Sequence, residues 1–254
     1  MLIKFLGTGG SCGVPFWNCD CRVCKSKNPK DQRLRSVLFI KIGDKNIAID
    51  GGPDFRTQLL KYKIKKLDYV FLTHAHGDHI NGSSEFSKQP NLIVETPTPV
   101  LKEFYVRIGP GKDWLMRRNP SMIMQNFSKK IIGGVTVDTV KLDHGKDNID
   151  KPTPCFGYVF RSEKFSFAYL TDYSAILEPK KLKNLDLIIS DGCNLEAGHG
   201  HAGVEGSIKV YNDLRPKKML LTHLNHHSLY DELSKKLKKV GNIGVAYDGL
   251  EIKC

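Results

Sequence analysis

The sequence contains no run of about 18 or more apolar residues, which is the length that a membrane-spanning helix needs. It also lacks a basic N-terminal segment followed by an apolar run and a small-residue cleavage site, so we expect no secretory signal. These two absences argue against a membrane protein and favour a cytoplasmic one.

An even set of cysteines is missing as well. The chain has seven cysteines, of which Cys19, Cys21 and Cys24 lie close together in the sequence and the rest are scattered. An odd count without a secretory signal argues against a disulfide framework and for reduced thiols. A compact cysteine group in such a chain more often binds a metal ion.

Low-complexity linkers and runs of like charge that would divide the chain are absent, so we expect a single domain over residues 1–254. Hydrophobic residues make up 40% and charged residues 26% of the chain, which fits a globular protein with a large core. The sequence leaves the oligomeric state open, a homodimer included.

Acidic residues are few beside basic ones, 27 against 39, and the formal net charge is +12. A positive field raises the local concentration of anions such as phosphate esters or nucleic acid. Short lysine-rich runs at 61–66, 180–183 and 235–239 coincide with expected helices or helix ends. We interpret most of this charge as solvated surface.

Short apolar runs, rich in residues that favour strands, recur along the chain and predict strands buried on at least one face. They cover residues 3–6, 37–42, 47–49, 69–72, 92–94, 165–170, 187–189 and 219–221. Helix-like segments lie near 54–62, 98–106, 203–214 and 228–239. The weakly patterned stretch from 107 to 130 is predicted to be a loop or lid.

The central motif is Thr73-His74-Ala75-His76-Gly77-Asp78-His79, which follows an apolar strand. Residues two apart in an extended segment point the same way, so His74 and His76 are expected to hold one metal ion. The glycine permits a tight turn, after which Asp78 and His79 are expected to face a second ion. Imidazole nitrogens with a carboxylate oxygen suit zinc, manganese or iron.

The pattern His-x-His-x-Asp-His after an apolar strand resembles that of the metallo-β-lactamase superfamily. The resemblance runs in order along the whole chain and implies an α/β fold, a four-layer αββα sandwich with two transition-metal ions, zinc or manganese, at one edge. It assigns His74, His76 and His144 to one ion, Asp78, His79 and His223 to the other, Asp172 as a bridge between them, and Asp50 as the carboxylate that orients the ligands.

The segment Gly198-His199-Gly200-His201 resembles one that phosphodiesterase branches of this superfamily carry before the last metal-binding histidine. His201 occupies the position of a residue that contacts phosphate and protonates the leaving oxygen, a role that suits the near-neutral pKa of histidine. We therefore assign His201 and Asp78 as the catalytic residues. The alternative is that His201 only hydrogen-bonds a neighbouring carboxylate.

The cysteine group has the spacing Cys-x-Cys-x-x-Cys, which supplies three corners of a tetrahedral zinc site within a loop at about 12–25. His226 is the expected fourth ligand of this structural zinc, with His227 as the alternative. The combination resembles the branch of phosphoribosyl 1,2-cyclic phosphate phosphodiesterases. The stretch Pro15-Phe16-Trp17-Asn18-Cys19 also resembles a pyrroloquinoline quinone biosynthesis protein of the same superfamily.

The sequence therefore predicts a phosphodiesterase that hydrolyses a small cyclic or nucleotide-like anionic diester with a hydroxide bridging two metal ions. One alternative is a tRNA 3′-end processing endonuclease, which the basic charge favours and the lack of a long basic arm disfavours. Another is a non-catalytic carrier of the quinone-biosynthesis type.

Overall fold

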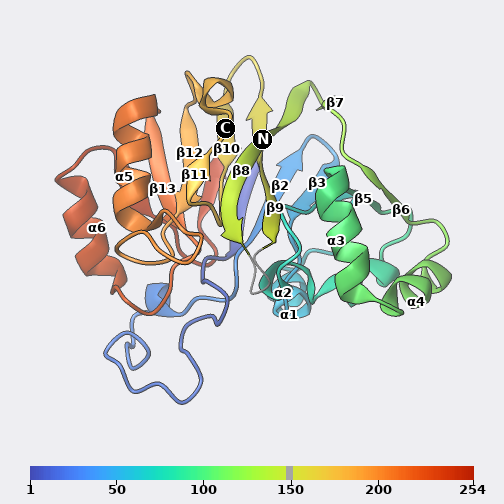
Figure 1. Cartoon of the computed structure of the whole chain (residues 1–254), viewed down its shortest axis with the longest axis horizontal. Coiled ribbons are helices and arrows are strands. Elements are labelled where there is room, and N and C mark those ends of the chain that lie inside the picture. The colour runs from blue at the N-terminus through green and yellow to red at the C-terminus, as the bar shows by residue number, and fades with distance from the viewer. Residues whose placement is uncertain (147–150) are drawn as a thin grey trace.

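The protein, in a computed structural model that describes residues 1–146 and 151–254, has two facing β-sheets with helices outside them (Figure 1). The first sheet has the order β15 (Glu251–Lys253), β1 (Leu2–Gly7), β2 (Val37–Ile42), β3 (Lys45–Ile49), β4 (Tyr69–Phe71), β5 (Ile93–Thr96) and β6 (Ile123–Asn126). The second has the order β11 (Ala175–Ile176), β8 (Val135–Lys146), β9 (Pro152–Arg161), β10 (Ser166–Tyr169), β12 (Leu187–Asp191), β13 (Lys218–Thr222) and β14 (Ile243–Val245), with β7 (Lys130–Ile132) paired to β8.

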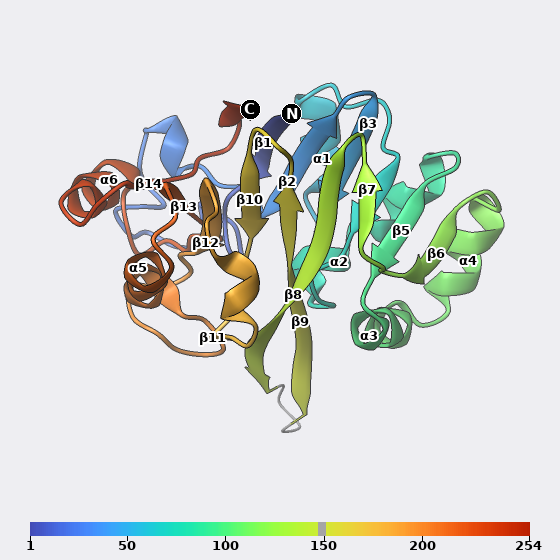
Figure 2. The ribbon, with the colours of Figure 1, turned by 90° about the horizontal axis from the view of Figure 1, so that it is seen from above.

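Helices lie outside both sheets, as the view from above shows (Figure 2). On the side of the first sheet are α1 (Phe55–Lys61), α2 (Gly77–Ile80), α3 (Thr98–Ile108) and α4 (Gly111–Arg118), and on the side of the second are α5 (Gly203–Leu214) and α6 (Tyr230–Lys238). Short 3-10 turns are η1 (Pro29–Asp31), η2 (Ser83–Lys88) and η3 (Pro179–Leu182).

Three apolar clusters separate these four layers. Ile3 and Phe5 of the first sheet meet Tyr158 and Phe160 of the second in a core that is fully buried between the sheets. One further cluster packs the helices α1 to α4 onto the first sheet, and another packs α5 and α6 onto the second. The predicted αββα sandwich is thereby confirmed. Among the described residues, no helix is both long and apolar enough to cross a membrane.

The parallel strands place the predicted site residues at one edge of each sheet. The strands β3 to β6 run parallel in the first sheet, as do β10, β12, β13 and β14 in the second. Because parallel strands end at the same edge of a sheet, the loops after them lie close together, and such loops commonly carry the chemistry of α/β folds. Asp50, His74, Asp172 and His223 all come just after such strands.

The predicted loop over residues 107–130 was wrong, because the structure has α4 and β6 there. The helix α4 buries only Leu115 and otherwise carries exposed or half-exposed, mostly polar side chains. The strand β6 lies at the edge of its sheet and buries none of its four residues. Neither element therefore shows the apolar periodicity by which buried helices and strands are recognised.

Candidate metal centre

Three histidines converge at the edge of the two sheets. His74 and His76 lie on the loop between β4 and α2, and His144 lies near the end of β8. Their ring centroids are 4.7 to 5.0 Å apart, and Nε2 of His144 is 3.1 Å from Nδ1 of His76. Because Nδ1 of His144 donates to the carbonyl of Gly200 at 2.9 Å, its Nε2 is left with a free lone pair.

A second cluster adjoins the first and contains two carboxylates. Nε2 of His79 is 3.3 Å from Oδ2 of Asp78 and 3.2 Å from Oδ2 of Asp172. Nε2 of His223 is 3.4 Å from each of the same two carboxylates. Oδ1 of Asp172 also lies 4.0 Å from Nε2 of His144, so this carboxylate stands between the two clusters.

Asp50 anchors the clusters from behind. Its fully buried carboxylate accepts hydrogen bonds from the backbone N–H of Thr73 at 2.8 Å, the hydroxyl of Thr73 at 2.9 Å and Nδ1 of His79 at 2.8 Å. The hydroxyl oxygen of Thr73 in turn lies 3.0 Å from Nδ1 of His74. This network holds the Nδ1 protons of both histidines and turns their Nε2 lone pairs toward the site.

The donor atoms that face inward fit bound cations. Nε2 of His74, Nε2 of His79 and Oδ2 of Asp172 are buried and form no hydrogen bond among the described residues, although the last two atoms lie 3.2 Å apart. A buried polar atom without a partner is costly, and convergent imidazole and carboxylate donors are the usual ligands of zinc and manganese. Metal ions at these positions would satisfy all three atoms.

Burial and neighbouring charges favour the ligand states of His74 and Asp172, whereas, despite burial, the nearby carboxylates raise the pKa of His79 and of His223. Burial and the facing imidazole of His79 hold the pKa of His74 well below its usual value, so its lone pair stays free. Burial alone would raise the pKa of Asp172, but the imidazoles of His223 and His79 hold it well below the usual range. A neutral imidazole and an ionised carboxylate are the forms that bind metal.

Three residues at the strand ends adopt left-handed backbone conformations. Asp50, Asp172 and His223 have φ angles of 67°, 58° and 58°. Such conformations are unfavourable for non-glycine residues, and they collect at functional sites where the surrounding structure enforces them. Here they turn each side chain from its strand end into the common site.

His201 reaches the site from the loop before α5. Its Nδ1 is 3.2 Å from Oδ2 of Asp191 at the end of β12, and its Nε2 is 3.8 Å from Oδ1 of Asp172. Burial lowers the pKa of His201, but the hydrogen bond to Asp191 and the proximity of Cys193 and Asp172 raise it to about 10. His201 is therefore protonated at neutral pH in this arrangement. His199, by contrast, lies exposed at the tip of the turn.

The cysteine group forms a separate cluster. Sγ of Cys19, Cys21 and Cys24 lie 3.3, 3.5 and 3.5 Å from Nδ1 of His226. A tetrahedral zinc, with bonds of about 2.3 Å to sulfur and about 2.0–2.1 Å to nitrogen, separates these ligands by roughly 3.5 Å. The four side chains thus fit one zinc ion. The ring of His227 lies next to that of His226 at an angle of 39°, with centroids 5.1 Å apart, but His227 is not part of the cluster.

Thiolate formation is already favoured at Cys21, whereas burial raises the pKa of Cys24 to about 11. The backbone N–H of Cys24 donates to Sγ of Cys21 at 3.4 Å. This hydrogen bond and the one to His226 together outweigh the effect of burial and lower the pKa of Cys21 to about 6. Thiolate is the form of cysteine that binds zinc.

The family model described as "Beta-lactamase superfamily domain" matches residues 45–224, a span that begins at β3 and ends just after His223. The chain belongs to the metallo-β-lactamase superfamily.

Several known proteins resemble the chain over most of its length. A crystal structure described as a new diphosphatase from the PhnP family superposes with a TM-score of 0.87 and 27% identity, covering 100% of this chain and 97% of the other. A ribonuclease Z of Clostridium beijerinckii is 24% identical over 80% of this chain and 70% of its own length. A Porphyromonas gingivalis octanoyltransferase is 32% identical over 97% of this chain, which spans half the length of that relative.

These likenesses confirm that the chain is a metal-dependent hydrolase of the metallo-β-lactamase fold and that it resembles the PhnP branch. Divalent metal ions are therefore its cofactors. All site residues predicted from the sequence come together in the structure: seven in the double cluster, Asp50 behind it, His201 beside it, and the cysteines with His226 in their own cluster.

Two residues beside His201 were not predicted from the sequence. Asp191 is fully buried and contacts His201, and Cys193 accepts a hydrogen bond from Nδ2 of Asn225 at 3.1 Å and lies close to His201 and His223. A signal for Asp191 was present, because it ends a buried strand as Thr222 does just before His223. No pattern in the sequence singles out Cys193.

Proposed function

We propose that the chain hydrolyses small anionic phosphodiesters at a centre of two transition-metal ions. His74, His76 and His144 would hold one ion, and Asp78, His79 and His223 would hold the other, with Asp172 between the two sets of ligands. The observation that carries this proposal is the position of the Asp172 carboxylate, 3.2 Å from His79 and 4.0 Å from His144 in the neighbouring cluster. A shared carboxylate of this kind is typical of paired metal sites.

Two divalent cations at this position would lower the pKa of a bound water and neutralise charge on a phosphoryl group. Asp50 and Thr73 fix the ligand geometry through the hydrogen bonds to His79 and His74. Fixed ligands keep the donor atoms aligned during the reaction, and removal of such supporting groups typically lowers metal affinity or activity about 10- to 100-fold.

His201 is the general acid in this proposal. Its Nε2 faces the shared carboxylate at 3.8 Å, while Asp191 accepts the Nδ1 proton and stabilises the imidazolium. A protonated imidazole beside the reacting phosphoryl group donates a proton to the departing oxygen. This assignment predicts strong dependence on His201 for substrates whose leaving group is a poor one.

A structural zinc at Cys19, Cys21, Cys24 and His226 supports the same site. His226 lies three residues after His223, so the cysteine loop and a ligand of the catalytic centre share one short segment. The ring of Phe16 stacks on His226 with centroids 5.4 Å apart and covers it. Binding of zinc there would contribute folding free energy and hold this segment in place.

The substrate proposed here is a phosphorus centre with two bridging oxygens. Cyclic and linear phosphodiesters have this arrangement, and so does a diphosphate that is esterified at both ends. The likeness to a PhnP-family diphosphatase supports inclusion of the diphosphate group. The zinc loop, which fits the cyclic phosphodiesterase branch named above, supports the cyclic diester.

Purified holoprotein tests the proposal directly. Cyclic phosphates, linear diesters, diphosphate diesters and monoesters are to be compared at equal concentration by product analysis. Turnover of the diesters with little action on monoesters is expected. Efficient release of phosphate from monoesters, with no turnover of any diester, would contradict it.

A second candidate function is cleavage of precursor tRNA. The relative named ribonuclease Z and the net charge of +12 favour it. Site-specific cleavage of a precursor tRNA, with no turnover of a ribose cyclic phosphate in the same assay, would replace the small-substrate proposal with this one.

A further inference from the structure

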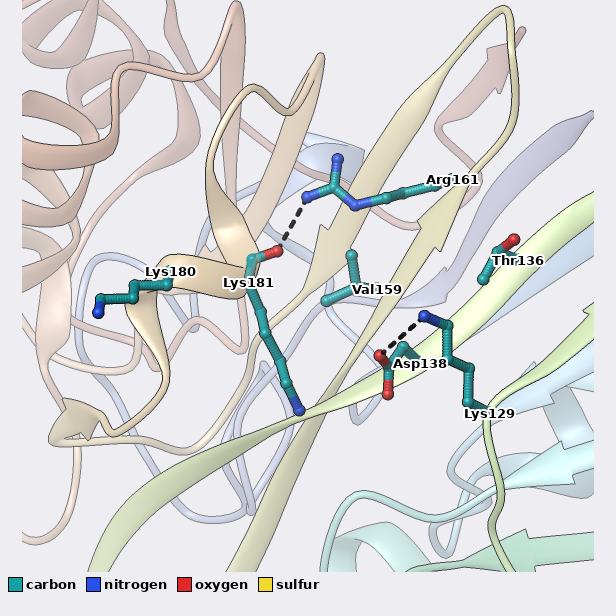
Figure 3. Close-up of a pocket in the computed structure, with 7 residues that line it drawn as sticks. All are labelled: Lys129, Thr136, Asp138, Val159, Arg161, Lys180 and Lys181. Carbon is teal, nitrogen blue, oxygen red and sulfur yellow. Dashed lines mark hydrogen bonds and ion pairs between the residues drawn. The ribbon is translucent and has the colours of Figure 1, made fainter.

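A pocket of about 280 Å³ lies on the second sheet (Figure 3). Its floor is formed by β8 and β9, where Thr136 pairs with Arg161 and Asp138 pairs with Val159. Val137, between Thr136 and Asp138, points into the core between the sheets. Because side chains alternate along a strand, Thr136 and Asp138 face outward, and the pocket is on the outer face.

Positive charge dominates the walls. Lys180 and Lys181 come from η3, Lys129 from the segment before β7, and Arg161 from the end of β9, while Asp138 is the single carboxylate of the lining. Lys129 approaches Asp138 only to 4.0 Å, and the side chain of Lys180 has no ion-pair or hydrogen-bond partner among the described residues. The lysine run 180–183, interpreted above as solvated surface, thus supplies part of a defined cavity.

Arg161 is held in place before any ligand arrives. One guanidinium nitrogen, Nη2, donates to the carbonyls of Lys181 and Lys183 at 2.9 and 3.1 Å. Lys181 is held too, because its Nζ donates to the carbonyl of Thr139 at 2.9 Å and pairs with Glu178 at 3.0 Å. The remaining donors of Arg161 have no partner among the described residues and line the pocket. A fixed guanidinium with free donors suits phosphate.

The pocket is distinct from the metal centre. Thr136 and His144 are eight residues apart on the continuous strand β8, and a strand rises about 3.3 Å per residue, which places them roughly 26 Å apart. A ligand small enough for this pocket cannot span that distance.

We propose that this pocket is a second ligand site, which binds a small phosphate monoester such as a sugar phosphate. Its cations bind the phosphate group, and Val159 in the floor is the apolar residue of the lining that the organic part would contact. At about 280 Å³ the cavity is slightly smaller than most small-molecule sites, roughly 300–1,000 Å³, so it suits a small ligand. The site does not depend on the reaction proposed for the metal centre.

Isothermal titration of the holoprotein at low ionic strength tests this site, with ribose 5-phosphate, inorganic phosphate and a 20-nucleotide RNA as separate probes. The double substitution Lys129→Gln with Lys180→Gln removes two charges and leaves the hydrogen bonds of Arg161 intact. Arg161→Gln is the second variant. Lys65→Gln is the matched control, since Lys65 is exposed and outside the pocket.

Wild-type protein is expected to bind one more equivalent of ribose 5-phosphate than either pocket variant, or to bind it about 10- to 100-fold more tightly at that site. Inorganic phosphate is expected to bind there more weakly, and Lys65→Gln to behave as wild type. Equal stoichiometry and affinity in all four proteins would overturn the proposal. RNA binding that the pocket variants abolish, without binding of ribose 5-phosphate, would overturn it too.

Discussion

Replacement of Asp191 by asparagine tests whether the carboxylate of Asp191 keeps His201, the proposed general acid, protonated. The substitution keeps the size of the side chain but removes the charge that stabilises the His201 imidazolium at 3.2 Å. General acid catalysis is typically worth about 10²–10⁴-fold, so we expect Asp191→Asn to lower kcat on an alkyl phosphodiester by roughly 10- to 1,000-fold. An activated aryl diester, whose leaving group needs no proton, is expected to lose less than about 10-fold.

The pH dependence of the rate is expected to change in a defined direction in Asp191→Asn. The pKa of His201 is raised to about 10 from 6.5, so its acid form is present below the raised pKa and is lost as pH rises through it. Cations bound at Asp172 would weaken one of the interactions that raise this pKa. The alkaline fall in rate is therefore expected between pH 6.5 and 10 in the wild type. In Asp191→Asn it is expected to shift to lower pH.

A double-mutant cycle with His201→Ala decides whether Asp191 acts through His201. If it does, the double variant loses no more activity than His201→Ala alone, because the two residues form one unit. Losses that multiply would refute this reasoning. Metal content must be measured in each variant, since Oδ1 of Asp191 also lies 3.7 Å from Nδ1 of the proposed ligand His223.

Three further predictions concern metal content and stability. Elemental analysis of carefully purified protein should find three transition-metal ions per chain, and fully active protein with one or none would refute the paired site. His226→Ala should release one zinc and lower the melting temperature, whereas His227→Ala, its matched control, should do neither; retention of that zinc by His226→Ala would exclude His226 as a ligand. Burial raises the pKa of Asp248 to about 6 from 3.8, so between these two pH values the folded chain holds a proton that the unfolded chain has lost. The free energy of unfolding should therefore fall by about 3 kcal/mol as pH rises from 4 through 6. Urea unfolding should show a smaller fall in Asp248→Asn, and equal pH slopes in both proteins would contradict the assignment.

Much of the fold was predictable because its strands are buried. All eight runs predicted as strands coincide with observed strands, and the four predicted helices correspond to α1, α3, α5 and α6. The strands β4 and β13 are apolar along most of their length because they are buried on both faces, and this made them recognisable in the sequence. Elements at the edges were not predictable in this way, as α4 and β6 show, because they bury few or no side chains.

The site residues also differ in how far the sequence predicts them. The motif of three histidines and an aspartate within six residues is recognisable in the sequence alone. The resemblance to the metallo-β-lactamase superfamily, followed in order along the chain, then locates His144, Asp172 and His223. Contacts between distant segments carry no such local pattern. The contact between Asp191 and His201 depends on where β12 ends and on how the loop before α5 folds back. The spacing of residues in the sequence predicts neither.

The proposal that this hydrolase acts on small phosphodiesters is tested most directly by one competition assay. A ribose cyclic phosphate, its monoester product and a precursor tRNA are incubated together with the holoprotein, and products are followed by phosphorus NMR and gel electrophoresis. The cyclic diester is expected to open to a monoester without release of orthophosphate, and the tRNA is expected to stay intact. Site-specific cleavage of the tRNA with the cyclic phosphate unchanged would contradict it.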